Sequence, residues 1–334
     1  EYPMQNLIDP AILFFIFGVL AGTVKSNLEI PPAISRFLSL YLLMALGLKG
    51  GFALSQSGLT ADVGISLAAA VLLAIVIPLI GYAVLRRFVS GFDAAAVAAT
   101  YGSVSAVTFV TAVQTLENQG VPYGGHMAAA MALMESPAIV FAVVMANQVR
   151  RRMNANAHLT NGRVDAQASC NPRLGGILHE ALTDGAQMLL LGAMLIGLLT
   201  GDAGQAAMKP FSVDLFKGML AFFLLDMGLL AARNMAQIKG QSLWLVAYAI
   251  LGPLVHAAVA LLMAWALGFS VGNAALLMVL SASASYIAVP AVIRHAIPEA
   301  SPSLYFGMSL GLTFPFNILL GIPLYLHAAK SFIG

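Results

Sequence analysis

Three serines recur at every second position in the segment "LSASASYIAVP", residues 280–290. Tyr286 follows the last serine directly, and Pro290 lies five residues beyond that serine. A hydroxyl both donates and accepts hydrogen bonds, and a proline removes one backbone donor from a helix. In an apolar chain, this combination indicates an interrupted helix whose hydroxyls and freed backbone groups can bind a small ion.

The composition of the chain is that of a membrane protein. Of its 334 residues, 60% are hydrophobic and 9% are charged, whereas soluble globular proteins carry about 25% charged residues. The net charge of +2 and the short clusters of basic residues argue against nucleic-acid binding. The single cysteine, Cys170, cannot form an intramolecular disulfide.

The apolar stretches predict an all-α polytopic membrane protein with about ten transmembrane helices. A helix that crosses about 30 Å of hydrocarbon needs about 20 mostly apolar residues. The expected spans are residues 9–25, 32–54, 61–87, 91–118, 122–150, 177–200, 211–235, 241–267, 270–296 and 302–330. We expect the protein's own sequence to begin at Met4, because Glu1 to Pro3 resemble a vector remnant and no signal-peptide pattern precedes the first apolar run.

The longest polar stretch, residues 150–176, divides the chain into two halves and is expected to be a loop. We assign residues 4–150 to a first five-helix unit, 151–176 to a linker and 177–330 to a second five-helix unit. Basic clusters such as Arg86-Arg87 fall on one side of a ten-span chain, and cytoplasmic loops are enriched in Lys and Arg. We therefore expect a multi-pass protein of the inner (plasma) membrane, with the linker in the cytoplasm and both termini outside the cell.

The two halves resemble each other at a nearly constant offset. "MALGLKG" (44–50) matches "LDMGLLA" (225–231), and "YGSVSA" (101–106) matches "SASASY" (281–286). Five spans per half is an odd number, so the second copy enters the membrane from the opposite face and the repeat is inverted. Inverted repeats with interrupted helices at matching positions are typical of secondary transporters, whose site lies near the middle of the membrane.

The spans at 91–118 and 270–296 each have their least helical stretch in the middle. Unpaired backbone groups in lipid cost several kcal/mol apiece, so an interrupted helix must face protein or a watery cavity. A helix that restarts at the break directs N–H donors and the positive end of its dipole toward an anion, and the released carbonyls suit sodium. Serines also serve helix packing, and one cluster alone would favour that interpretation. Two clusters at equivalent places favour an ion site.

Glu135 is an ionisable residue in the middle of an apolar span, where such a group is costly. It either helps to coordinate sodium or forms hydrogen bonds in the protein interior. Asp226 is equally a site residue or a polar contact between packed helices. Further polar candidates at a similar depth are Gln114, Glu117 and Asn317.

Two pairs of glycines have a four-residue spacing, Gly18 with Gly22 and Gly47 with Gly51. Small residues at this spacing let two helix backbones approach closely. The pairs therefore predict either helix packing inside the chain or a contact between subunits.

The histidines do not form a metal-binding motif. "HEALT" (179–183) begins like a zinc-binding helix but has Thr183 where the second histidine must stand. His126, His256 and His295 are scattered, and we interpret them as packing or interface residues. We expect that the protein is not an enzyme and that it needs no cofactor, with Na⁺ as its coupling ion.

Five groups of residues carry a family resemblance over nearly the whole chain. They are "LGLKGG" (46–51), "GSVSAVTF" with "TLE" (102–117), "ESPAIV" (135–140), "SASASYIAVPAVIRHAIPEASPSLYFG" (281–307) and "GIPL" (321–324). Together they resemble the sodium-dependent bicarbonate transporter family first known from cyanobacteria. The resemblance implies a homotrimer of five-plus-five inverted repeats. It also implies that spans 3 to 5 and 8 to 10 carry the substrate, that spans 1, 2, 6 and 7 form a scaffold, and that bicarbonate and sodium bind around breaks in spans 4 and 9.

Carried onto this sequence, the resemblance nominates anion-binding residues at both breaks. They are Gly102, Ser103, Ser105, Ala106, Ser283, Ala284 and Ser285. For sodium we nominate Thr108 and Tyr286 from the same motifs, together with Glu135 and Asn317.

The chain departs from the family pattern at both breaks. Cyanobacterial members typically read Ser-Gly-Ser-Thr where this chain has Ser105-Ala106-Val107-Thr108, and Ser-Ser-Ser-Asp where it has Ser283-Ala284-Ser285-Tyr286. The lost carboxylate and the two lost hydroxyls weaken the cation site and can alter the anion site. Family members often bind a PII-like regulator from the cytoplasm, but the short linker at 151–176 argues against that partner here.

We therefore predict a sodium-coupled importer of a small inorganic anion, bicarbonate first, in the lipid bilayer. Its core would move against the scaffold in an elevator-like manner. A carrier similar to the bile-acid symporters shares the same plan but would need a wide cavity for an amphipathic organic anion. A membrane sensor that binds the anion and signals through the linker is a third hypothesis.

Overall fold

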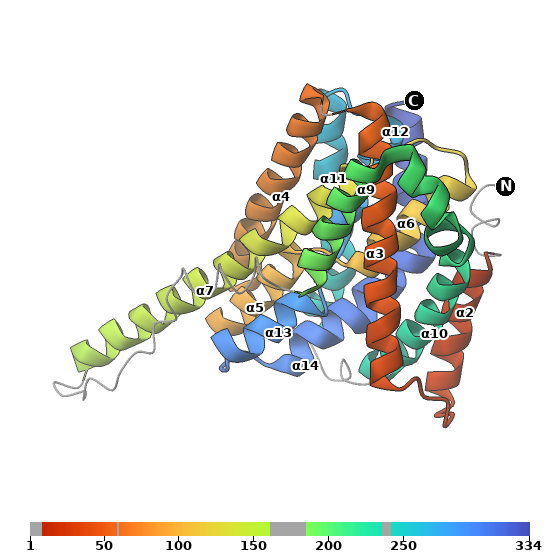
Figure 1. The fold of residues 1–334 in the computed structure, drawn as a ribbon. Coiled ribbons are helices and arrows are strands. Elements are labelled where there is room, and N and C mark those ends of the chain that lie inside the picture. The colour runs from red at the N-terminus through yellow and green to blue at the C-terminus, as the bar shows by residue number, and fades with distance from the viewer. Residues whose placement is uncertain (1–8, 59, 161–184, 236–241) are drawn as a thin grey trace.

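The computed structural model describes residues 9–58, 60–160, 185–235 and 242–334, without the side chains of residues 136, 152–160, 288, 291 and 295. All regular structure in these ranges is helical (Figure 1). Seven of the described helices are long and apolar enough to cross a membrane. The chain is thus an all-helical, multi-pass membrane protein.

The described residues of the first half of the chain form six helices. They are α2 (Pro10–Thr23), α3 (Pro32–Ser57), α4 (Ala61–Leu85), α5 (Gly91–Gly102), α6 (Ala106–Asn118) and α7 (Met127–Thr160). In the described part of the second half, two long helices come first, and the last span is divided into short helical segments. Its elements are α9 (Gly185–Lys209), η1 (Pro210–Asp214), α10 (Phe216–Met235), α11 (Leu243–Ala266), α12 (Val271–Ala282), α13 (Ala288–Ala296), α14 (Pro302–Phe306), η3 (Gly307–Thr313), α15 (Phe314–Phe316), η4 (Asn317–Gly321) and α16 (Ile322–Phe332). We call α4–α7 and α11–α16 the core, and α2, α3, α9, η1 and α10 the scaffold.

Each of the ten predicted spans contains at least one of these helices, yet only seven satisfy the length criterion. Two spans fall short because α2 has 14 residues and α12 has 12. Two others are joined, because the helical run from Gly185 to Met235 continues for 51 residues. Gly201, with φ of 50°, produces a kink in that run.

The expected linker differs from the structure at its start. Helix α7 continues to Thr160, so residues 151–160 are helical instead of forming a loop. This part of α7 projects beyond the bundle (Figure 1). The rest of the linker, 161–176, and the expected start of the second unit at 177 lie outside the described residues.

The scaffold consists of two helix pairs that cross at glycines, α2 with α10 and α3 with α9. A Cβ atom added to Gly18 would lie 2.3 Å from the Leu225 carbonyl oxygen. A Cβ atom on Gly51 would lie 2.1 Å from the Met194 carbonyl oxygen. Both predicted glycine pairs therefore serve close packing between helices of the same chain.

The starts of α5 and α12 make equivalent contacts. Ser90 caps α5 by accepting the Asp93 N–H at 3.1 Å, and the Asp93 carboxylate accepts the Ser301 N–H at 2.8 Å. Ser270 caps α12 through the Asn273 N–H at 3.4 Å, and the Asn273 side chain accepts the Gly124 N–H at 2.7 Å. The start of each helix thus accepts a hydrogen bond from the segment that precedes the last span of the other half.

Helix α11 presents an apolar face on the surface of the bundle. Trp244 and Trp265 stand near its two ends and are 66% and 65% exposed. At 1.5 Å per residue they are about 31 Å apart along the helix axis, close to the thickness of the hydrocarbon layer. Tryptophans are enriched at membrane interfaces, so this face suits contact with lipid.

Candidate functional site: two helix breaks and a shared cavity

The first break separates α5 from α6 at residues 103–105. Ser105 caps α6, because its Oγ accepts the Thr108 N–H at 3.2 Å and the Thr108 hydroxyl at 2.9 Å. At the end of α5, a Cβ atom on Gly102 would lie 2.6 Å from the Pro78 ring. Gly102 therefore lets Pro78 of α4 pack against the backbone of the break.

The second break separates α12 from α13 at residues 283–287. The Ser285 Oγ accepts the Val289 N–H at 3.3 Å, and the Ser283 hydroxyl donates to the Leu280 carbonyl oxygen at 2.9 Å. Pro290 lies in the first turn of α13, where helix N–H groups have no partner within the helix, so its missing donor costs little.

The two breaks touch each other. The Ser105 N–H donates to the Ser283 Oγ at 3.0 Å, and the Ser285 N–H donates to the Thr100 carbonyl oxygen at 2.8 Å. All four residues are buried. The sequence-based prediction that both helices are interrupted, and that the interruptions meet, is therefore confirmed in the structure.

A cavity of about 70 Å³ lies between the breaks and the scaffold. Its core wall consists of Val104, Ser105, Ala106, Met131, Ala132, Glu135, Ser285, Tyr286 and Ile287, and its scaffold wall consists of Ser39, Leu43, Ala186, Gln187 and Leu190. A site for one water needs about 10–15 Å³. The cavity can therefore hold several waters or one small inorganic anion.

Of the nominated residues, Ser105, Ala106, Ser285, Tyr286 and Glu135 line this cavity. The other nominated residues do not line the cavity and are buried near the breaks or in the last span. They are Gly102, Ser103, Thr108, Ser283, Ala284 and Asn317. Within the described part of the chain, the buried Ser103 hydroxyl has no hydrogen-bond partner.

Asn317 connects the last span to the second break. Its side-chain amide donates to the carbonyl oxygen of Ala282, the last residue of α12, at 2.9 Å. Its carbonyl oxygen accepts the Tyr325 hydroxyl at 2.9 Å. Both ends of the amide are thus engaged by the protein, which favours a structural role for Asn317.

Tyr286 occupies the position at which the family motif has an acidic residue. Its ring packs edge-on against Phe314, with centroids 5.1 Å apart, and its hydroxyl approaches the Met227 sulfur at 3.7 Å. The side chain therefore forms an aromatic part of the cavity wall, between the core and α10 of the scaffold.

Glu135 lies at the boundary between the core and the scaffold. Its carboxylate accepts a hydrogen bond from the Gln187 amide of α9 at 2.6 Å. Asp226, by contrast, accepts a hydrogen bond from Ser35 of α3 and is a polar contact between two scaffold helices. Gln114 and Glu117 lie far along α6 from the break and do not line the cavity.

Sequence reasoning missed the whole scaffold wall and the apolar residues of the core wall, Val104, Met131, Ala132 and Ile287. Gln187 is a polar residue in an otherwise apolar stretch, and this contrast could have marked it as a candidate site residue. Ser39 carries no comparable signal, because its helix contains several other small residues. Only the packing of α3 and α9 against the breaks brings these side chains to the site.

Letters of the hydrolase motif Gly-x-Ser-x-Gly occur at Gly268–Gly272 and Gly307–Gly311. Ser270 is the cap of α12, and Ser309 is buried in η3 and donates to the Tyr305 carbonyl oxygen at 2.7 Å. A nucleophile elbow requires a strand followed by a helix. Since both serines lie at or in helices, neither match has that context.

A comparison with protein families matches residues 10–330 to the Na⁺-dependent bicarbonate transporter superfamily. A comparison with curated proteins gives no match. The family match covers both breaks, the cavity and the scaffold, and agrees with the resemblance seen in the motifs. The chain belongs to the Na⁺-dependent bicarbonate transporter superfamily.

Proposed function

We propose that the protein is a symporter that imports bicarbonate, or a similar small inorganic anion, together with sodium across the plasma membrane. The observation that carries this proposal is the pair of touching breaks with a small cavity beside them. Two interrupted helices that meet at one place are the arrangement by which secondary transporters bind ions.

The cavity offers neutral donors to an anion. The Ser105 Oγ accepts two hydrogen bonds, and its own proton can turn from the neighbouring Tyr286 hydroxyl to an occupant of the cavity. Helix α6 begins at Ala106, and its positive end faces the cavity and favours an anion by about 0.3–2 kcal/mol. No Lys or Arg is among the described residues that line the cavity.

Glu135 gives a physical reason for coupling. Its carboxylate is on the cavity wall and repels bicarbonate. A sodium ion bound beside Glu135 removes that repulsion, so the anion binds well only when sodium is present. Symport of one sodium with one bicarbonate moves no net charge, and each additional sodium adds about 2.3 kcal/mol per 100 mV of inward drive.

The proposal includes a ten-span inverted repeat in which the core moves against the scaffold. The equivalent contacts of Asp93 and Asn273 support such a repeat. The position of the cavity between core and scaffold supports a moving core, because a sliding core would carry the occupied site past the scaffold helices. On the family resemblance, the proposal also includes a homotrimer with its termini outside, while the short linker at 151–176 argues against a PII-like regulator.

Uptake of radiolabelled bicarbonate into proteoliposomes tests this function. We expect uptake with an inward sodium gradient and little uptake with a matched potassium gradient. Uptake of organic acids alone would instead favour the bile-acid-symporter-like alternative. Saturable bicarbonate binding without uptake would favour a sensor.

A matched pair of serine variants tests the site in the same assay. Ser285→Ala removes a hydroxyl that lines the cavity and accepts the Val289 N–H of α13, and we expect a loss of uptake of about tenfold, the effect of about 1.4 kcal/mol. Ser281→Ala removes a buried hydroxyl that has no partner among the described residues and is not on the cavity wall, so uptake should stay near the parental rate. Equal uptake by both variants would contradict the proposed site.

A further inference from the structure

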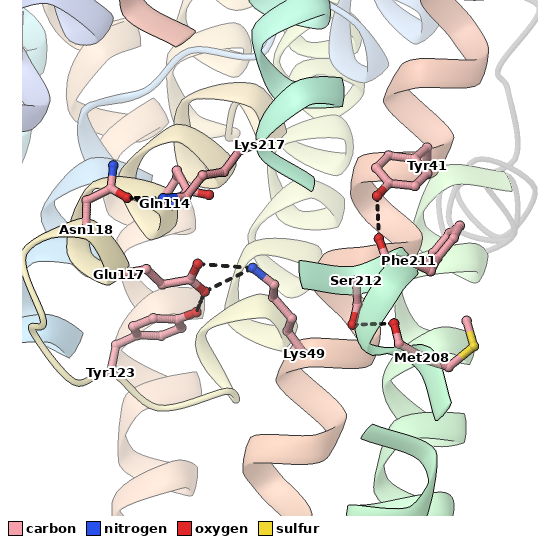
Figure 2. Close-up of polar contacts among 10 residues, drawn as sticks. All are labelled: Tyr41, Lys49, Gln114, Glu117, Asn118, Tyr123, Met208, Phe211, Ser212 and Lys217. Atoms are coloured by element: carbon pink, nitrogen blue, oxygen red, sulfur yellow. Dashed lines mark hydrogen bonds and ion pairs between the residues drawn. The ribbon is translucent and has the colours of Figure 1, made fainter. Parts of the chain in front are cut away.

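A second polar cluster lies at the far end of α6, away from the cavity (Figure 2). The Lys49 Nζ of α3 is 3.1 Å from both carboxylate oxygens of Glu117, and the Tyr123 hydroxyl donates to the same carboxylate at 2.9 Å. The Lys49 Nζ also stands 4.0 Å above the centre of the Phe216 ring. The Lys49 side chain is 12% exposed and the Glu117 side chain 32% exposed, so this ion pair is only partly shielded from water.

Asn118, the last residue of α6, extends the cluster to two more scaffold helices. Its side-chain oxygen accepts the Lys217 ammonium of α10 at 2.7 Å. Its amide nitrogen donates to the Asp9 carboxylate at 2.9 Å, and Asp9 caps the start of α2. We call these six residues the α6-end cluster: Asp9, Lys49, Glu117, Asn118, Tyr123 and Lys217.

The α6-end cluster joins the core to the scaffold at one place. Glu117, Asn118 and Tyr123 belong to the core, while Lys49, Lys217 and Asp9 belong to three different scaffold helices. Helix α6 connects this cluster directly to the first break, because it begins after Ser105 and ends at Asn118. At 1.5 Å per residue, Glu117 lies about 18 Å from Ser105 along the helix.

We propose that Lys49 and Lys217 are positioning residues that hold the core in the conformation seen here and must release α6 before the core can move. The inference rests on the proposed movement of core against scaffold. Because α6 is one continuous helix, a displacement of the break along its axis also displaces Glu117 and Asn118. Three polar contacts, Lys49 with Glu117, Lys217 with Asn118 and Asn118 with Asp9, must then break together.

Ala128 provides a reporter of that movement. It lies near the start of α7 in the core, is 3% exposed, and its methyl group is 3.4 Å from the place where a Cβ atom of Gly50 would be. Gly50 follows Lys49 on α3. A cysteine at position 128 is therefore covered by the scaffold while the α6-end cluster is intact, and becomes accessible when the core slides away.

The experiment measures how fast a thiol reagent modifies this cysteine in detergent, without bicarbonate. The background carries Cys170→Ser, which removes the single natural cysteine. Adding Lys49→Met and Lys217→Met to Ala128→Cys should raise the labelling rate by about fivefold or more, as expected for a population shift of this kind. The charge exchange Lys49→Glu with Glu117→Lys restores an ion pair of reversed polarity. In this variant the labelling rate at position 128 should return most of the way to that of Ala128→Cys alone.

Two controls separate release of the core from general loosening. Lys330→Met removes a lysine at the same end of the molecule whose contact, with Gln119 at 2.7 Å, lies within the core, and it should leave the rate unchanged. A cysteine at Ala98 reports on the core interior, because this residue is fully buried and faces α4. Its labelling should also stay unchanged in the lysine variants.

An unchanged rate at position 128, or an equal rise at positions 98 and 128, would overturn the positioning role. The assay does not depend on transport, so the two proposals fail separately. Normal sodium-driven uptake with unchanged labelling refutes only the positioning role. A faster reaction at position 128 in a protein that takes up no bicarbonate refutes only the proposed function.

Discussion

At the scale of single residues, the structure separates side chains that face the cavity from those that hold the breaks together. Ser105 and Ser285 do both, because each accepts an N–H from the first turn of the following helix and also lines the cavity. Ser283 is fully engaged in joining the breaks. Among the described residues that line the cavity, Glu135 is the one with a carboxylate.

Replacing Glu135 with Gln should raise the sodium concentration needed for half-maximal uptake by about tenfold, the effect of about 1.4 kcal/mol. The reason is that Gln removes the negative charge that favours sodium while keeping a side-chain oxygen that can accept the Gln187 hydrogen bond. Sodium titrations of bicarbonate uptake measure the change. Glu135→Asp keeps the charge and serves as the matched control. An unaltered sodium dependence in Glu135→Gln would assign the carboxylate to structure alone.

The polar residues of the core wall could be predicted from sequence, because hydroxyls and a carboxylate inside apolar spans stand out. The scaffold wall could not. Ser39 and Gln187 reach the cavity only through the packing of α3 and α9, which depends on contacts between residues far apart in the chain. Gly102 is nominated from the motif and Asn317 from its depth, whereas their contacts with Pro78 and Ala282 indicate packing and hydrogen bonding.

At the scale of elements, the breaks and the glycine contacts have opposite effects on mobility. A break leaves backbone groups to be satisfied by another element, as Ser285 and Thr100 show. A glycine contact instead lets the backbones of two helices pack against each other at short distance. The apolar periodicity of the sequence located the helices, and serines located the breaks, but the glycine spacing left open whether the contact is within a chain or between chains.

Gly51→Ala should destabilise the scaffold. The new methyl group would lie 2.1 Å from the Met194 carbonyl oxygen, so α3 and α9 must move apart at a cost of about 1–3 kcal/mol. Gly192→Ala on α9 is a matched control, because its methyl group would meet open space and helix propensity even favours Ala by up to about 1 kcal/mol. Thermal unfolding in detergent should show a lower midpoint for the first variant alone. Equal midpoints would contradict close packing at Gly51.

At the scale of the whole molecule, contacts between distant segments tie the two halves together at both ends of the bundle. Arg150 near the middle of α7 forms an ion pair with Glu299 at 2.7 Å and donates to the Ala296 carbonyl oxygen at 2.9 Å. The hydrogen bond from Arg150 lowers the pKa of Glu299 below its ordinary value of 4.5. Since the folded-state pKa is the lower one, this pair stabilises the fold above about pH 4.5, and the contribution is lost as pH falls through the lowered value.

Glu299→Gln should therefore lower the unfolding midpoint slightly at pH 7. The pair is partly exposed, so the effect stays below about 1 kcal/mol. The difference in unfolding midpoint between variant and parent should disappear once the pH falls below the pKa that Glu299 has in the folded protein. Unfolding midpoints across a series of pH values measure this difference. Asp202→Asn is the control, because it removes an exposed carboxylate that does not contact Arg150. A difference that persists in acid would mean that the ion pair is not its source.

The placement of Trp244 and Trp265 has a spectroscopic consequence. The chain contains two tryptophans, and both are on the outer face of α11, near opposite ends of the helix. The tryptophan emission of the protein therefore comes from two fluorophores at the two ends of one helix. Lipids that carry heavy-atom quenchers at known depths would report how deep each end of α11 lies in the bilayer, without any added dye.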